Sequence, residues 1–280
     1  MTEAAKLHEL QEREREFWNK KAQESAAALD LDMYRVTPDA VHDPAMPWLP
    51  YMGVTHMVRR VLDVLGDVRG KRVLDIGAGT GFMSVALALR GAYVVATDVA
   101  EQPLEVGAFR AKVSGVSDRI EFRRVASESL EFADNSFDIV TGLFTLHHLD
   151  LAHAAKEMHR VLKPGGKGGF VETSGRNKLL IAARNTLPGR YGIDKAGSDD
   201  EIPLDARAET HLRAAFGDGV RYHYPDLVFM RMLAANIGLF RFQPMMWALK
   251  ATDNVMWSLH ILRSWSYFVA VELEKDTAAQ

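Results

Sequence analysis

Short apolar runs alternate with helical periodicity through the middle of the chain. Residues with strand character occur at 72–76, 93–97, 120–125, 137–142 and 167–172, and segments with helical spacing lie at 80–90, 101–114 and 149–162. Strands that alternate with helices are typical of a parallel sheet covered on both faces. The pattern therefore predicts an α/β fold, with a Rossmann-like, doubly wound and mostly parallel sheet.

The chain before residue 67 follows a different pattern and is expected to be an N-terminal helical extension, residues 1–66. Residues 3–28 are rich in strong helix formers, and residues 53–65 have a second helical pattern. Four prolines between residues 31 and 50 exclude a regular helix or a central strand. This stretch is either a connector packed on the core or a flap over the active site.

The main domain is expected to span residues 67–280, with a lid insertion at 175–224. The insertion is rich in glycine, proline and mixed charge, and it is too long for a plain connection. After it the spacing predicts a helix over 226–236, a strand near 239–246 and a helix over 246–262. Residues 265–274 are aromatic and β-branched, which predicts an antiparallel last strand.

Composition narrows the function classes. The formal net charge of -3 disfavours nucleic acid as a partner, because a broad basic surface is what such binding needs. Cysteine is absent, which excludes disulfides and thiolate metal sites. The charged N-terminus lacks a signal-peptide core, and no apolar run is long enough for a membrane span. We expect a cytoplasmic protein, and a homodimer is compatible with the sequence.

The glycine turn at residues 77–81 carries the strongest chemical signal. The strand at 72–76 contains Asp75 and leads into Gly77, Ala78, Gly79 and Gly81, where a helix begins. Without side chains the backbone can approach a ligand closely, and the first N–H groups of the helix are open to polar contacts. The following strand ends in Asp98, a position suited to binding ribose hydroxyls.

The spacing of these glycines separates two cofactor classes. A dinucleotide turn has the pattern G-x-G-x-x-G, whereas here Phe82 replaces the third glycine, which argues against a dehydrogenase. The stretch 73–81, VLDIGAGTG, resembles the first motif of class I S-adenosylmethionine-dependent methyltransferases. Residues 137–140, 146–149 and 162–166 resemble later segments of that family, in the same order. The resemblance covers about residues 70 to 174, and residues 225 to 274 more loosely.

The resemblance implies S-adenosyl-L-methionine as the cofactor and gives each site residue a role. The glycine turn with Ala78 approaches the methionine and ribose portions, and Asp75 supports the cofactor's ammonium group. The resemblance also implies that Asp98 contacts the ribose, that Val99 and Ser127 contact the adenine, and that Leu143 contacts the methionine end. Ala126 departs from the family pattern, since many relatives have an aspartate there, and this leaves the adenine contact open.

Three side chains are candidates for catalysis, because the carboxyl ends of the strands are where the reaction occurs. His148 is the first candidate for a general base and His147 the second, since imidazole titrates near neutral pH. Glu172, at the end of the fifth strand, would orient an acceptor hydroxyl or act as base in C-methylation. Each also has a structural interpretation: the histidines as helix caps and Glu172 as a packing residue. The spacing of the histidines does not predict a metal site.

We therefore predict a small-molecule methyltransferase whose acceptor is partly apolar, with oxygen as the first choice of accepting atom. Aromatic residues at 222–247 favour an apolar acceptor pocket, although the same spacing suits plain core. Two alternatives remain. One is a C-methyltransferase of a prenyl diphosphate that uses Glu172 and the lid arginines, with magnesium. The other is a module that binds the cofactor without catalysis.

Overall fold

The computed structural model describes residues 3–26, 34–37, 54–186, 203–236 and 243–277. Its centre is a seven-stranded sheet in the order β3-β2-β1-β4-β5-β7-β6. Strands β1 to β5 are parallel, and β7 is antiparallel to both of its neighbours. The predicted doubly wound fold is confirmed. The strands are β1 (Arg72–Ile76), β2 (Tyr93–Asp98), β3 (Ile120–Arg124), β4 (Phe137–Leu143), β5 (Leu162–Thr173), β6 (Arg221–His223) and β7 (Phe268–Glu274).

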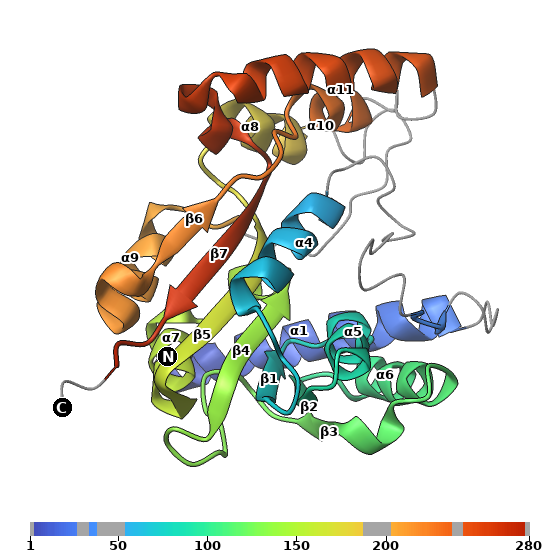
Figure 1. Ribbon diagram of the computed structural model, residues 1–280, viewed down its shortest axis with the longest axis vertical. Helices are drawn as coiled ribbons and strands as arrows, with labels where there is room; N and C mark the ends of the chain where they lie inside the picture. The colour runs from blue at the N-terminus through green and yellow to red at the C-terminus, as the bar shows by residue number, and fades with distance from the viewer. Residues whose placement is uncertain (1–2, 27–33, 38–53, 187–202, 237–242, 278–280) are drawn as a thin grey trace.

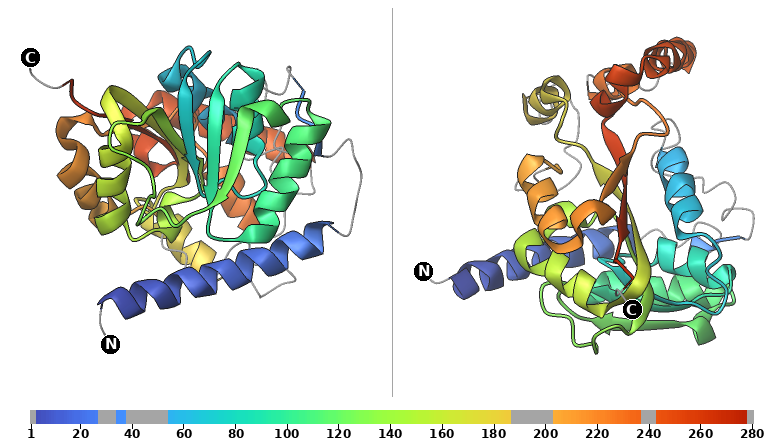
Figure 2. Two further views of the ribbon diagram at one scale, coloured as in Figure 1. Left: turned by 90° about the horizontal axis from the view of Figure 1, so that it is seen from below. Right: turned by 60° about the vertical axis from the view of Figure 1, so that its left-hand side comes forward.

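Helices cover both faces of the sheet, as the edge-on view in Figure 2 shows. One face carries α4 (Val54–Leu65), α5 (Phe82–Leu89) and α6 (Glu101–Val113). The other carries α7 (Leu151–Val161) and α9 (Ala206–Phe216). Short 3-10 turns follow α6, β4 and α9 as η1 (Ser117–Arg119), η2 (Leu146–His148) and η3 (Gly217–Gly219). Each face therefore has its own apolar core, with the sheet between them.

The long helix α1 (Glu3–Ala26) lies outside these layers and packs on α6 (Figure 2). The side chain of Asn19 accepts a hydrogen bond of 3.2 Å from the backbone N–H of Gln102, at the start of α6. This contact fixes α1 near the carboxyl end of β2, the edge of the sheet where the glycine turn lies.

Helices α8 (Lys178–Thr186), α10 (Met230–Asn236) and α11 (Gln243–Ser258) gather at one end of the molecule, with the 3-10 helix η5 (His260–Trp265) (Figure 1). Arg231 of α10 is buried between two aspartates. Its guanidinium donates to Asp253 at 2.9 Å and to Asp226 at 2.9 and 3.0 Å. This buried triad joins α10 to α11.

The structure corrects the sequence predictions in the last third of the chain. The strand predicted near 239–246 is wrong where it is described, because residues 243–246 begin α11, and residues 237–242 lie outside the described residues. The helix predicted over 226–236 begins only at Met230, because Asp226 is paired with Arg231 in the preceding loop. Strand β6 was not predicted, since three residues inside the insertion give no periodicity.

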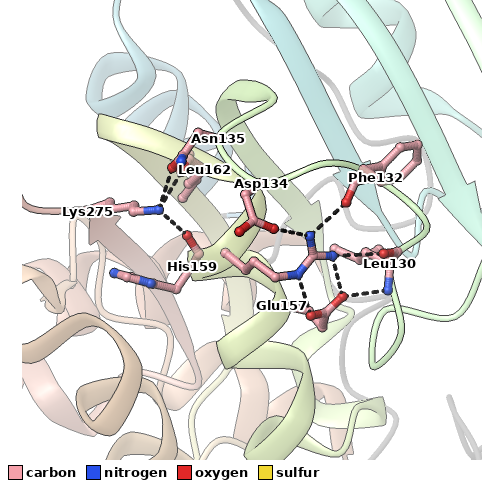
Figure 3. Close-up of polar contacts among 9 residues, drawn as sticks. Leu130, Phe132, Asp134, Asn135, Glu157, His159, Leu162 and Lys275 are labelled. Carbon is pink, nitrogen blue, oxygen red and sulfur yellow. Dashed lines mark hydrogen bonds and ion pairs between the residues drawn. The ribbon is translucent and has the colours of Figure 1, made fainter.

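Two networks of charged side chains fasten the end of the molecule opposite the glycine turn. Arg160 of α7 donates to Glu157, to Asp134 and to the carbonyls of Leu130 and Phe132 (Figure 3). Lys275, after β7, donates to the side chain of Asn135 and to the carbonyls of His159 and Leu162 (Figure 3). The loop between β3 and β4 is thereby held to α7.

Across the described residues, no helix is both long enough and apolar enough to cross a bilayer.

Candidate functional site

The glycine turn has a left-handed backbone at three positions. Gly77, Gly79 and Gly81 have φ values of 57°, 50° and 72°. An L-residue with a Cβ atom is strained in this region by about 1–2 kcal/mol, so glycine suits each position. The N–H of Ala78 donates to the carbonyl of Thr97 at 2.9 Å, which ties the turn to β2.

The space beside these glycines differs from one to the next. A Cβ atom on Gly77 would overlap the Thr145 hydroxyl, and one on Gly81 would lie 3.0 Å from the backbone of Gly107. These two glycines permit close packing within the protein. A Cβ atom on Gly79 would meet nothing within 4 Å. Of the three glycines of the turn, Gly79 is therefore the one whose backbone is open to a ligand.

Asp75 is buried beneath the turn, in β1. Its Oδ2 accepts a hydrogen bond of 2.5 Å from the Ser84 hydroxyl. Its Oδ1 is buried and has no partner among the described residues. Burial raises the pKa of this carboxyl to about 7, with a further rise from Asp98, against the lowering effect of Ser84. A buried acceptor without a partner suits a ligand that brings a donor such as an ammonium group.

Asp98 ends β2 and accepts hydrogen bonds from its own loop. Its Oδ2 accepts from the N–H of Gly79 and its Oδ1 from the N–H of Ala100, both at 2.9 Å. Burial raises the pKa of Asp98, opposed by these N–H groups. Because each carboxylate oxygen has two lone pairs, the group retains capacity to accept from ligand hydroxyls.

The other predicted cofactor residues lie at the same edge of the sheet. Val99 follows β2, Ser127 follows β3 and Leu143 ends β4. Ser127 is buried, whereas Val99 and Leu143 are half-buried. Because β1 to β4 are parallel, all of these positions lie at their carboxyl ends. The structure thus brings the predicted set together around the glycine turn.

Glu172, in β5, holds the chain that leaves β4. Its Oε1 accepts from the backbone N–H groups of Thr145 and Leu146 at 2.8 and 2.6 Å, and its Oε2 lies 2.6 Å from Nδ1 of His147. The side chain is fully buried. Phe144, just before these groups, has a φ of 55°, unusual for a bulky residue. Glu172 is therefore placed to fix this loop and the ring of His147.

His148 pairs with a residue that the sequence did not single out as functional. Its Nδ1 lies 3.2 Å from Oε2 of Glu14 in α1, and both side chains are nearly buried. The imidazole rings of His147 and His148 are 4.1 Å apart, centre to centre. The charge of His148 also acts on Asp98, where it opposes the rise in pKa. Two carboxylate–histidine pairs thus lie next to each other at the end of β4, close to the glycine turn.

Helix α1 crosses the carboxyl edge of the sheet. Besides Glu14, its Gln11 donates to Oε2 of Glu128 at 3.1 Å, and Oε1 of Glu128 accepts from the N–H of Asp150. The helix therefore contacts the loops after both β3 and β4. Most of the stretch that we considered as a flap, residues 31–50, lies outside the described residues. No spacing in the sequence indicates that Glu14 reaches His148 or that Thr145 lies against Gly77.

The lid arginines that could hold an anionic acceptor are Arg184, Arg190, Arg207, Arg213 and Arg221, of which Arg190 lies outside the described residues. Arg213 pairs with Glu209, and Arg221 pairs with Glu272 and Glu274. Within the part of the chain that the structure describes, histidines and carboxylates form no group of three suited to a metal ion. A groove of about 310 Å³ lies at the end of β6, away from the glycine turn, and is lined by Arg60, Tyr222, His223, Tyr224, Pro225 and Arg263.

Comparison with known proteins agrees with this geometry. Residues 74–169 match the family described as a methyltransferase domain. A ubiquinone biosynthesis O-methyltransferase of Pseudomonas syringae pv. tomato is 42% identical over 118 residues, which cover 41% of this chain and 50% of that protein. A demethylmenaquinone methyltransferase of Clavibacter sepedonicus is 48% identical over 104 residues, which cover 37% of this chain and 41% of that protein. The chain thus spans half or less of these relatives' length.

A solved structure supports the fold. An S-adenosylmethionine-dependent methyltransferase from Mesorhizobium loti superimposes with a TM-score of 0.52 at 19% identity, over 79% of this chain and 98% of that one. At that identity the likeness concerns the fold alone. The matched residues 74–169 include the glycine turn, Asp98 and the histidine pair, whereas Glu14 and Glu172 lie outside them. Residues 74–169 are therefore similar to a methyltransferase domain, and the fold is that of an S-adenosylmethionine-dependent methyltransferase.

Proposed function

We propose that the protein transfers a methyl group from S-adenosylmethionine to a hydroxyl of a small, partly apolar molecule. The observation that carries the proposal is the pair of adjacent carboxylate–histidine contacts, Glu14 with His148 and Glu172 with His147, next to the glycine turn. A hydroxyl must lose its proton to accept a methyl group, and a histidine held by a carboxylate is suited to take it. The name of the Pseudomonas relative, an O-methyltransferase, supports oxygen as the acceptor.

Three features of the turn suit the cofactor. The open space at Gly79 admits it, Oδ1 of Asp75 can accept from its ammonium group, and Asp98 can accept from its ribose hydroxyls. When bound, the cofactor supplies a methyl group on a sulfonium, which is already a good leaving group. The protein must then align the acceptor and remove its proton.

His148 is the general base in this proposal, and Glu14 is its positioning residue. Nδ1 of His148 lies 3.2 Å from Glu14, which positions the ring that takes the proton of the acceptor. The carboxylate fixes the ring and favours the imidazolium that forms. Glu172 is also a positioning residue here, because its two oxygens already bind two N–H groups and His147.

Substitutions of the His148 pair test this assignment. Assayed against a panel of phenols, His148→Ala is expected to lower kcat by about 10²–10⁴-fold with little change in cofactor Kd, the range for losing a general base. Glu14→Gln is expected to lower kcat less and to shift the pH profile of kcat. Gln11→Ala, which removes a neighbouring contact of α1, is the matched control and should retain the wild-type pH profile.

Two outcomes would contradict the proposal. Turnover that is unchanged in His148→Ala would remove His148 as the base. Cofactor binding without methylation of any hydroxyl would favour a binding module instead, and a product methylated at carbon would remove oxygen as the acceptor.

A further inference from the structure

Helices α8, α10, α11 and η5 form one end of the molecule, which we term the apolar end (Figure 1). This end exposes large apolar side chains. Ile261 is 83% exposed and Trp247 70%. Elsewhere in the described residues, Tyr93 alone is an exposed large hydrophobic residue. A concentration of this kind marks an interaction surface rather than ordinary scatter. The other members of the apolar end are Leu179, Val255, Leu259 and Trp265.

Helix α11 is apolar on both of its sides. Its inward side holds Met246, which is buried, and Asp253, which pairs with Arg231 of α10. Its outward side presents Trp247, Ala251 and Val255, four residues apart and all exposed. A row of exposed apolar side chains on a helix commonly marks a contact surface. The outward side of α11 is therefore suited to a partner.

The charges at the apolar end have one sign. From residue 227 to 271 the sequence contains a single acidic residue, Asp253, and it is buried against Arg231. Lys250 of α11 and Lys178 of α8 are exposed, and neither has a carboxylate partner among the residues described. The surface therefore combines tryptophans and aliphatic side chains with unneutralised cations.

These charges distinguish between two partners for the apolar end, a second copy of the chain and a lipid surface. A second copy of the chain would bring Lys178 and Lys250 toward their own equivalents, with no exposed carboxylate between residues 227 and 271 to pair with them. An anionic bilayer complements both properties, since tryptophans favour the membrane interface and lysines favour anionic headgroups. We propose that the apolar end docks on an anionic lipid surface without crossing it.

In this arrangement Trp247 and Ile261 enter the interface, and Lys178 and Lys250 lie among the lipid phosphates. The docking does not depend on methyl transfer, because none of these residues belongs to the glycine turn or to the histidine pair.

Vesicle co-sedimentation of the full chain tests the proposal. The protein is expected to bind vesicles of an equimolar mixture of phosphatidylcholine and phosphatidylglycerol, and not vesicles of phosphatidylcholine alone. The double variant Trp247→Ser/Ile261→Ser should bind at least about tenfold more weakly, because two apolar side chains no longer enter the interface. Lys178→Gln/Lys250→Gln should bind about thirtyfold more weakly, from the usual contribution of a lysine near an anionic surface.

Matched controls lie away from the apolar end. Tyr93→Ser removes the exposed aromatic residue at the start of β2, and Arg207→Gln removes an exposed cation of α9. Both should bind vesicles as the wild type does. Leu259→Ser is a further variant at an exposed position, should the double variant melt below the wild type.

Three results would overturn the proposal. The first is a wild-type protein that binds neither kind of vesicle. The second is a loss of binding in Tyr93→Ser equal to that in Trp247→Ser/Ile261→Ser. The third is a dimer, seen by light scattering, that the same double variant dissociates while vesicles do not bind, which would assign the apolar end to a second copy.

Discussion

Gly77 and Gly79 share a backbone conformation and differ in what surrounds them, so their alanine variants form a matched pair. Both variants have a strained left-handed residue, a cost of about 1–2 kcal/mol. Gly77→Ala adds a clash with the Thr145 hydroxyl, which brings its expected cost to about 2–5 kcal/mol. Thermal or denaturant unfolding measures both costs.

For cofactor binding the expected order is reversed: if both variants fold, Gly79→Ala should lose more affinity than Gly77→Ala. Gly79→Ala places a methyl group in the open space and is expected to weaken cofactor binding at least about tenfold. The account of the turn would be contradicted if Gly79→Ala bound the cofactor as the wild type does.

The buried carboxyl group of Asp75 is expected to make cofactor binding depend on pH. The pKa of Asp75 in the folded protein, about 7, lies above the ordinary value of 3.8, so between these values the folded protein holds a proton that the unfolded chain releases. The stability contributed by Asp75 is therefore full below about pH 4 and is lost as the pH rises toward 7. A cationic ammonium beside Oδ1 favours the ionised carboxyl, so cofactor affinity should rise between about pH 6 and 8, with release of a proton.

Calorimetry in buffers of different ionisation enthalpy measures that proton release. Asp75→Asn is the control, because the amide keeps the shape of the side chain and does not titrate. The same proton release in Asp75→Asn as in the wild type would show that another group is responsible.

Much of the residue-level site was predictable from local sequence. The glycine turn, Asp75 and Asp98 are identifiable because the turn requires glycine and each strand brings its last residues to one edge. Thr145 and Glu14 were not predictable, because they reach the site through packing between segments distant in sequence.

At the scale of elements, α10 and α11 depend on the buried triad. Arg231→Met leaves Asp226 and Asp253 buried without their cation, and the expected loss of stability is about 3–5 kcal/mol. Thermal unfolding measures it. Arg207→Gln, at an exposed position of α9, is the control and should unfold within about 0.5 kcal/mol of the wild type. A variant Arg231→Met as stable as the wild type would show that the triad does not hold these helices.

The helices and strands whose bounds were predicted well are those in which apolar residues follow a single periodicity along the sequence. Strands β1 to β4 and helices α4 to α7 have one buried side or are wholly buried, and their bounds fall within a few residues of the prediction. The strand predicted near residues 239–246 was wrong at residues 243–246, which begin α11, because apolar side chains on both sides of this helix obscure its helical spacing. The apolar residues on the outward side of α11 can be read in the sequence itself, and the docking proposal depends on them.

At the scale of the whole molecule, α1 connects loops that lie far apart in sequence. It contacts the start of α6 and the loops after β3 and β4, which surround the glycine turn. Cofactor binding is therefore expected to slow amide hydrogen exchange in α1 and in these loops, and to leave α11 unchanged. Equal protection of α1 and α11 would indicate a global gain in stability instead.

We expect S-adenosylmethionine to bind in the space beside Gly79. Isothermal calorimetry of the wild-type chain with S-adenosylmethionine, S-adenosylhomocysteine and NAD measures this binding. One site per chain is expected for the first two ligands, and no binding is expected for NAD. Binding of NAD with no binding of S-adenosylmethionine or S-adenosylhomocysteine would contradict this expectation.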